Sequence, residues 1–166
     1  MEVIATAGET AELLAAHPRA QYLVFPEDRR FPVRMAEDLP LRWIERGPRE
    51  SFAGEAMRGE FFAFQIGICA ARSAIADLDV TFSDLTQVKP ASPPGLRPAA
   101  IPSSGAHSFN TRGVNWDGRE FKKACAVARG KIQPLWCGFA IPRDIPPGEY
   151  GGEVVVQPIG LSPTRV

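Results

Sequence analysis

The clearest pattern along the chain is a period of two in its central part. In the stretch 60–71, Phe62, Phe64, Ile66 and Ile68 occupy alternate positions and share one face, whereas most residues between them are smaller or more polar. This alternation predicts a long β-strand with a core-facing side and a partly covered side.

Other segments are rich in β-branched, aromatic or alternating apolar residues, and we expect strands at 21–25, 79–85, 131–142 and 153–158. Two weaker candidates, 41–44 and 51–57, lack a strong period. The short connection 74–78 is compatible with one helical turn. Taken together, these segments predict roughly seven to nine antiparallel strands.

The first 25 residues have a different pattern. The stretch 3–5 is a candidate short strand, and Thr6 and Glu9 have the spacing of a capping box. A helix is expected to follow and to end before Pro18. With the strand at 21–25, these residues predict a β-α-β lead-in, either the tail of an upstream segment or an arm packed on the main domain.

Composition favours β-structure, because the 166 residues include 16 Pro and 15 Gly. We expect a mainly β protein with an antiparallel β-sandwich, immunoglobulin-like or jelly-roll-like, over 26–158. The lead-in covers 1–25, and 159–166 is expected to be a frayed or truncated tail. The proline-rich stretch 89–105 is expected to be an ordered connector.

Two turns are predicted from local chemistry. Asn115-Trp116-Asp117-Gly118 favours a hairpin turn, because Asp-Gly supplies positive φ angles. The Pro-Pro-Gly run before Tyr150 predicts a sharp turn, and we expect the Tyr150 hydroxyl to bond back to that loop, as in sandwich corners.

Charge is balanced, with 19 basic and 19 acidic residues, so nothing electrostatic favours nucleic acid or an anionic membrane as a partner. The basic residues Arg29, Arg30 and Arg34 have acidic neighbours, which is typical of a solvated surface. The N-terminus lacks a signal-peptide pattern, and no stretch reaches membrane-span length. If the chain is a fragment, an export signal could precede it, and the protein would then be secreted or periplasmic.

Three cysteines, Cys69, Cys125 and Cys137, are expected to be buried thiols, although one disulfide with a spare thiol is the alternative. Neither they nor the two histidines have metal-ligand spacing, so no metal and no cofactor is predicted.

No complete active site is evident. Ser103 and Ser104 lie near His107, but no nucleophile elbow is present, and a Cys137–His107 pair lacks a predicted helix N-terminus to activate the thiol. Carboxylate pairs that a glycosidase would need lie at turns or strand ends, where they are ordinarily solvated: Glu37 with Asp38, Asp117 with Glu120, and Glu149 with Glu153.

The tryptophans are the remaining functional candidates, since sugar rings stack on exposed aromatic faces. Trp116 suits this role best among Trp43, Trp116 and Trp136, because Asn115 and Asp117 flank it. Packing of Trp116 on its own domain or on a neighbouring one is the favoured interpretation, because large aromatic side chains are usually buried or at interfaces.

Two blocks of sequence together resemble the N-terminal domain of glycoside hydrolase family 123 and its uncharacterised relatives. The first block comprises FPEDRRFPVRM (25–35), 38–40, 42–44 and GEFFAFQ (59–65). The second comprises 109–110, GVNWDG (113–118), LWCG (135–138) and PPGEYGG (146–152).

The resemblance implies a β-sandwich followed by a catalytic (β/α)-barrel, which holds an Asp-Glu pair and releases β-linked N-acetylgalactosamine. This chain ends before any barrel begins, so no catalytic residue carries over. We therefore expect a non-catalytic accessory module that packs against that barrel; a carbohydrate-binding module is the alternative. The candidate interface or glycan-contact residues are His107, Asn110, Asn115, Trp116, Asp117 and Trp136.

Overall fold

The computed structural model describes residues 2–34, 36–88 and 99–166. Its described part is mainly β and sandwich-like, as the sequence predicted. The elements in chain order are α1 (Ala7–Ala16), β1 (Leu23–Asp28), α2 (Leu41–Arg46), β2 (Phe61–Cys69), β3 (Leu78–Phe82), β4 (Leu85–Gln87), β5 (Ala100–Ile101), a 3₁₀ turn (Ser103–Gly105), β6 (Ala106–Ser108), β7 (Arg112–Val114), β8 (Glu120–Lys122), β9 (Ile132–Ala140), β10 (Tyr150–Gly151), β11 (Val154–Pro158) and β12 (Thr164–Arg165).

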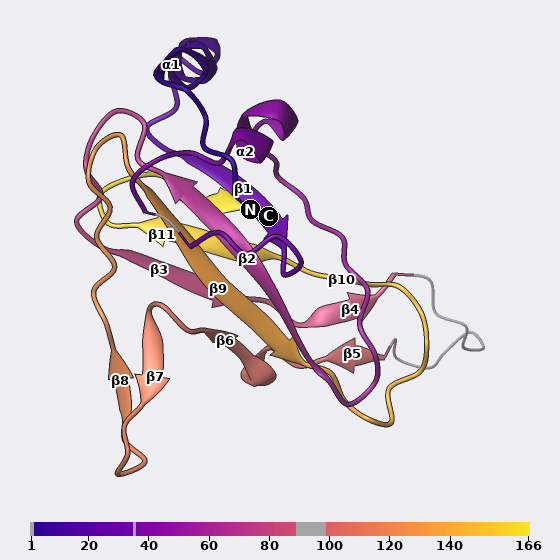
Figure 1. Cartoon of the computed structure of the whole chain (residues 1–166). Coiled ribbons are helices and arrows are strands. Elements are labelled where there is room, and N and C mark those ends of the chain that lie inside the picture. The colour runs from indigo at the N-terminus through magenta and orange to yellow at the C-terminus, as the bar shows by residue number, and fades with distance from the viewer. Residues whose placement is uncertain (1, 35, 89–98) are drawn as a thin grey trace.

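Two layers of antiparallel strands enclose the main core. One layer is the sheet β1-β2-β9-β6, and the other is made of β12-β11-β3 and β10-β4-β5 (Figure 1). Their facing side chains meet in a buried cluster that includes Phe64, Ile66, Leu135, Val80 and Val156. Hydrophobic burial between the layers therefore holds the sandwich together.

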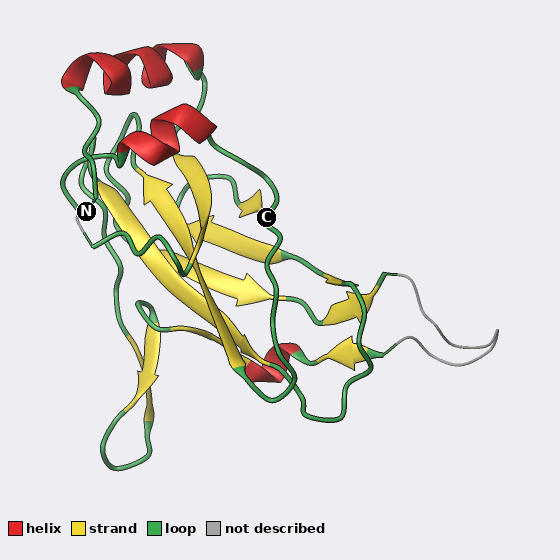
Figure 2. Cartoon of the chain, turned by 45° about the vertical axis from the view of Figure 1, so that its right-hand side comes forward, coloured by secondary structure: helices red, strands yellow, loops and turns green. Residues whose placement is uncertain are grey.

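The strand β2 is buried on both of its faces. Phe64, Ile66 and Ile68 point into the main core, as the period of two predicted. The opposite, outer face is covered at one end by α1, α2 and the loop residues 29–34 and 36–40, which together we call the cap (Figures 1 and 2). Gly67 lies directly beneath the Trp43 indole, and a Cβ built there would lie 2.0 Å from that ring.

The cap corrects one strand prediction. The stretch 41–44 belongs to the helix α2, which ends at Gly47 with φ 69°. The helix places Trp43 against Phe25, with ring centroids 5.1 Å apart and planes 4° apart. It also brings Arg42 and Arg46 close together, because residues four apart are neighbours on a helix, whereas in a strand they would share a face but lie about 13 Å apart.

Three other local predictions were wrong. The stretch 51–57 forms no strand; instead Phe52 stacks on Phe62 and Phe64 at the sandwich edge. The connection 74–78 contains no helical turn, because Ile75 exchanges two backbone hydrogen bonds with Val127. The described residues contain more strands than expected, since the second layer is divided into pieces of two to five residues.

The two ends of the chain are tied into the fold. The capping box of Thr6 and Glu9 is confirmed at the start of α1. The stretch 159–166 is not frayed, because β12 pairs with β11 and the Tyr22 hydroxyl donates to the Ser162 carbonyl at 2.8 Å. The expected boundary at residue 25 falls inside β1, which pairs with β2 along its whole length.

The predicted corner and thiols are confirmed. The Tyr150 hydroxyl donates to the Pro146 carbonyl oxygen at 2.7 Å. Cys69, Cys125 and Cys137 are buried free thiols. Of the predicted connector 89–105, the part 89–98 lies outside the described residues. No helix in the described ranges is long and apolar enough to cross a bilayer.

Candidate functional site

The six candidate residues fall into two separate places. Asn115, Trp116 and Asp117 form the tip of the β7–β8 hairpin, whereas His107, Asn110 and Trp136 lie on β6, β9 and the turn beside them. The hairpin projects away from the sandwich body in both views (Figures 1 and 2). The structure therefore offers two surfaces, which we call the hairpin tip and the sheet face.

The hairpin tip presents its tryptophan fully to solvent. Gly118 has φ 80° and its amide donates to the Asn115 carbonyl at 2.9 Å, which confirms the predicted turn. The Trp116 side chain is 99% exposed, so of the two expected packing arrangements it does not pack on its own domain, and packing on a neighbouring domain stays a prediction. Val114 and Phe121 on the flanking strands are also exposed. An apolar arm of this kind is typical of an interaction surface.

Hydrogen bonds on either side of Trp116 shape the turn. The Asp117 carboxylate accepts from the Arg119 amide at 3.2 Å and pairs with the Arg119 guanidinium at 3.5 Å. The Asn115 amide donates to the Arg119 carbonyl at 2.8 Å. These bonds shape the turn and engage the Asp117 carboxylate, whereas Asn115 contributes its backbone amide.

One carboxylate fixes the base of the hairpin. Asp79 on β3 accepts from Arg112 of β7 at 2.9 Å and lies 3.3 Å from the Lys122 ammonium of β8. Burial raises the pKa of Asp79, but hydrogen bonds from the Val80 amide, Arg112 and Lys122 outweigh it, so the pKa lies below its ordinary value. The hairpin is thus held to the sandwich by ion pairs.

The sheet face carries a cluster of three rings. Phe61 of β2 stacks on His107 of β6, with centroids 6.0 Å apart and planes 27° apart. Phe109 meets Phe61 edge to face at 5.6 Å and 63°. The Phe61 ring lies over Gly138 of β9, where a Cβ would clash at 2.3 Å. All three aromatic side chains are exposed, Phe61 by 39% and Phe109 by 58%.

Asn110 and Trp136 support this cluster. The Asn110 side-chain oxygen accepts from the Trp136 amide at 2.6 Å, and the Phe109 amide donates to the Trp136 carbonyl at 2.9 Å. Trp136 is half-buried beside them. The structure thus brings His107, Asn110 and Trp136 together, and it adds Phe61 and Phe109, which sequence reasoning missed. Phe61 was the one bulky residue on the face of its strand that otherwise holds small or polar residues.

Several of the polar groups considered for catalysis have structural partners. The Ser103 hydroxyl and amide both donate to Asp84 at 2.7 Å. Burial raises the pKa of the Cys137 thiol to about 12, so it stays protonated beside His107's strand. Glu37 pairs with Lys131 and Glu153 with Arg165. Across the ranges that the structure describes, no cluster of three metal-ligating side chains occurs.

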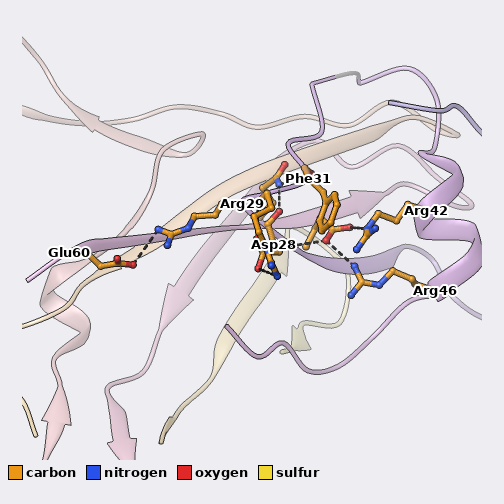
Figure 3. Close-up of polar contacts among 9 residues, drawn as sticks. Asp28, Arg29, Phe31, Arg42, Arg46 and Glu60 are labelled. Carbon is orange, nitrogen blue, oxygen red and sulfur yellow. Dashed lines mark hydrogen bonds and ion pairs between the residues drawn. The ribbon is translucent and has the colours of Figure 1, made fainter. Parts of the chain in front are cut away.

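A further polar cluster lies under the cap, where sequence reasoning expected only solvated charge. Glu27 is 1% exposed, and its carboxylate accepts from Arg42 at 3.0 Å and Arg46 at 2.9 Å (Figure 3). Arg29 pairs with Glu60 at 3.2 Å, and the same figure labels both residues. The acidic neighbour of the arginine run is therefore buried, because α2 folds over it.

Buried Gln65 holds the loop of the cap. Its side-chain oxygen accepts from the Val33 amide at 2.8 Å, and its amide donates to the carbonyls of Asp28 and Phe31 at 3.2 and 3.1 Å. A cavity of about 700 Å³ opens beside this loop, between Phe31, Arg34 and Trp43. The first resembling block of sequence thus corresponds to one packed unit, the cap with its supporting strands.

Comparisons with known proteins give a partial likeness to a solved structure. No family model and no curated protein matches the chain. Among solved structures, it is similar to a family 123 glycoside hydrolase from Clostridium perfringens that hydrolyses glycolipid glycans, with 17% identity and a TM-score of 0.49. The match covers 66% of this chain and 21% of that chain, so this chain spans about a fifth of the enzyme's length.

Proposed function

We propose that this chain is a non-catalytic accessory β-sandwich of a larger glycoside hydrolase, of the β-N-acetylgalactosaminidase type that the two sequence blocks resemble. It packs against a catalytic (β/α)-barrel of the same polypeptide. The observation that carries the proposal is the hairpin tip, where the side chains of Trp116, Val114 and Phe121 are exposed to solvent. A two-stranded ribbon alone is marginally stable, and a partner surface would stabilise it.

The hairpin tip fits a partner domain better than a sugar. Its carboxylate is engaged within the turn, since Asp117 pairs with Arg119. Its aromatic and aliphatic side chains have the composition of an interface core, in which tryptophan is enriched. The alternative, in which Trp116 is the platform of a carbohydrate-binding module, predicts that Trp116→Ala abolishes glycan binding.

The first test is the size of the native protein in its source cells, by immunoblot with an antibody raised against this chain. The accessory-module proposal expects a band several times larger than the 18.1 kDa of this chain. A single band at 18 kDa would reject it, since no barrel would then share the polypeptide.

Oxidative footprinting of the tryptophans tests the docking surface. In the isolated chain, Trp116 should be oxidised first, Trp136 more slowly and Trp43, which is 2% exposed, last. In the full-length protein, Trp116 should be protected while Trp43 behaves as before and serves as the internal control. Equal oxidation of Trp116 in both proteins would show that the hairpin tip is not the contact.

A further inference from the structure

We propose that the chain forms a symmetric dimer in which the outer edge of β8 pairs with β8 of a second copy as antiparallel strands. The paired residues are Glu120, Phe121 and Lys122. This backbone edge is separate from Trp116, so the pairing leaves the Trp116 side chain free to contact another domain. The proposal goes beyond the proposed function and does not depend on it.

The backbone of β8 has unused hydrogen-bonding groups on its outer side. The bonds that join β7 and β8 fall on odd-numbered residues, as in the bond from the Lys123 amide to the Thr111 carbonyl at 2.9 Å. Because inward and outward groups alternate along an antiparallel strand, the amides and carbonyls of Glu120 and Lys122 point outward. In the described part of the chain, β8 pairs with β7 alone, and every residue of 114–124 is exposed. The edge is therefore open to another strand.

The sequence of β8 is complementary to itself when it is read in the opposite direction. With Phe121 opposite Phe121 of the second copy, Glu120 of each copy lies opposite Lys122 of the other. Opposite charges and aromatic rings that face each other across antiparallel strands are stabilising. A register centred on Glu120 or on Lys122 would place like charges opposite each other. Charges on an edge usually oppose pairing, but here a second copy of the same strand neutralises them.

The three side chains are available for these contacts. Glu120 has no ion-pair partner in the ranges that the structure describes. The Lys122 ammonium lies 3.3 Å from Asp79 and has further donors for a second carboxylate. The Phe121 ring is 42% exposed and lies across Gly113, where a built Cβ would be 2.7 Å from it. The ring is therefore already positioned on one face of the ribbon.

The expected dimer is weak. The hairpin projects from the sandwich body, so a second copy can reach its edge (Figures 1 and 2). Pairing would turn a two-stranded ribbon, which is marginal by itself, into a four-stranded one. Three residues on each side, however, bury much less than the roughly 1,600 Å² of a standard interface. We therefore expect association that depends strongly on protein concentration.

The experiment is sedimentation equilibrium of this chain from about 10 μM to about 1 mM, the range in which weak dimers form. The mass of the wild type should rise from 18.1 kDa towards twice that value as the concentration increases. Glu120→Lys places like charges opposite each other at both ends of the pairing and should weaken association about tenfold or more. Trp116→Ala is the matched control, because it changes the same hairpin away from the β8 edge, and it should associate as the wild type does.

A mixture of two charge variants gives a sharper result. Glu120→Lys and Lys122→Glu should each fail to pair with themselves, whereas an equimolar mixture should form heterodimers, because a positive strand then faces a negative one. Three results would overturn the proposal: a wild type that stays at 18.1 kDa throughout, unchanged association of Glu120→Lys, or a mixture that associates no better than its components. Loss of association in Trp116→Ala would also overturn it, since the contact would then lie at the hairpin tip.

Discussion

Glu27 shows how a single residue organises the cap. Both of its carboxylate oxygens accept hydrogen bonds, one from Arg42 and one from Arg46, and one also accepts the Asp28 amide at 2.9 Å. Arg42 in turn lies 3.5 Å from the centroid of the Phe31 ring. The carboxylate therefore links β1, α2 and the loop of the cap at a site that is shielded from water.

Replacing Glu27 with Gln should destabilise the protein by about 1–3 kcal/mol, because two guanidinium groups would lose their anionic acceptor. Both arginines keep access to water, which limits the loss. The measurement is urea denaturation. Glu153→Gln is the matched control, since its pair with Arg165 is exposed on both sides and should contribute less than about 1 kcal/mol. Equal effects of the two changes would contradict the structural role of Glu27.

At the scale of elements, the hairpin depends on its ionic base. Asp79 contacts the first residue of β7 and the last residue of β8, so one carboxylate holds both strands. The tip lies far along the ribbon, and the turn bonds at Asn115 and Gly118 shape it locally. The orientation of the hairpin is therefore set at β3, whereas its form is set by its own sequence.

Asp79→Asn should raise hydrogen–deuterium exchange of the β7 and β8 amides while leaving β2 and β9 unchanged. Without the carboxylate charge, the side chain at position 79 attracts Arg112 and Lys122 less strongly. Asp117→Asn at the tip is the control and should affect only the turn. If exchange in β7 and β8 stays at the wild-type rate, Asp79 does not hold the hairpin.

Lowering the pH should weaken the contact between Asp79 and the base of the hairpin. The pKa of Asp79 in the folded protein lies below its ordinary value of 3.8, so folding favours the charged form. The stabilisation is complete above that ordinary value and is lost as the pH falls below it, through the folded pKa. Exchange in β7 and β8 should therefore rise below about pH 4 in the wild type and change less in Asp79→Asn, once rates are corrected for intrinsic pH dependence.

At the scale of the whole molecule, the sandwich and the cap share one strand. The strand β2 gives Phe64, Ile66 and Ile68 to the main core, and its other face gives Cys69 to the core of the cap. Gln65 and Gly67 complete that second face. Because neither core can lose β2 without exposing apolar surface, we expect them to unfold together.

Gly67→Ala tests this coupling. The added methyl would overlap the Trp43 ring, so the cap must shift and the variant should be destabilised by about 1–3 kcal/mol. Tryptophan fluorescence and far-ultraviolet circular dichroism should report the same lowered midpoint in urea. Two separated transitions would show that the cap unfolds independently of the sandwich.

Gly8→Ala is the matched control for that substitution. Gly8 lies in α1, and the nearest atom to a built Cβ is the Thr6 hydroxyl oxygen at 3.9 Å. The same methyl group should therefore stabilise the protein, by about 0.5–1 kcal/mol, through helix propensity. A loss of stability in both variants would mean that overlap with Trp43 is not the cause.

The strongly patterned parts of the chain determined their own structure. The alternation in β2 and β9, the capping box at Thr6, the Asp-Gly turn and the Tyr150 corner each depend on near neighbours, so their sequence was sufficient. The sandwich-like fold follows from these pieces, because long two-faced strands must bury their apolar side against another layer.

Only the tertiary structure decided which charged side chains pair and which aromatic rings cluster. The segment 41–46 is too short for its helical period to be evident, and the spacing of Arg42 and Arg46 acquired meaning only when Glu27 lay opposite. Likewise, Phe61 is far in sequence from His107 and Phe109, and it meets them because β2 and β6 both pair with β9. Burial and clustering depend on which strands become neighbours, and that is a property of long-range pairing rather than of any local pattern.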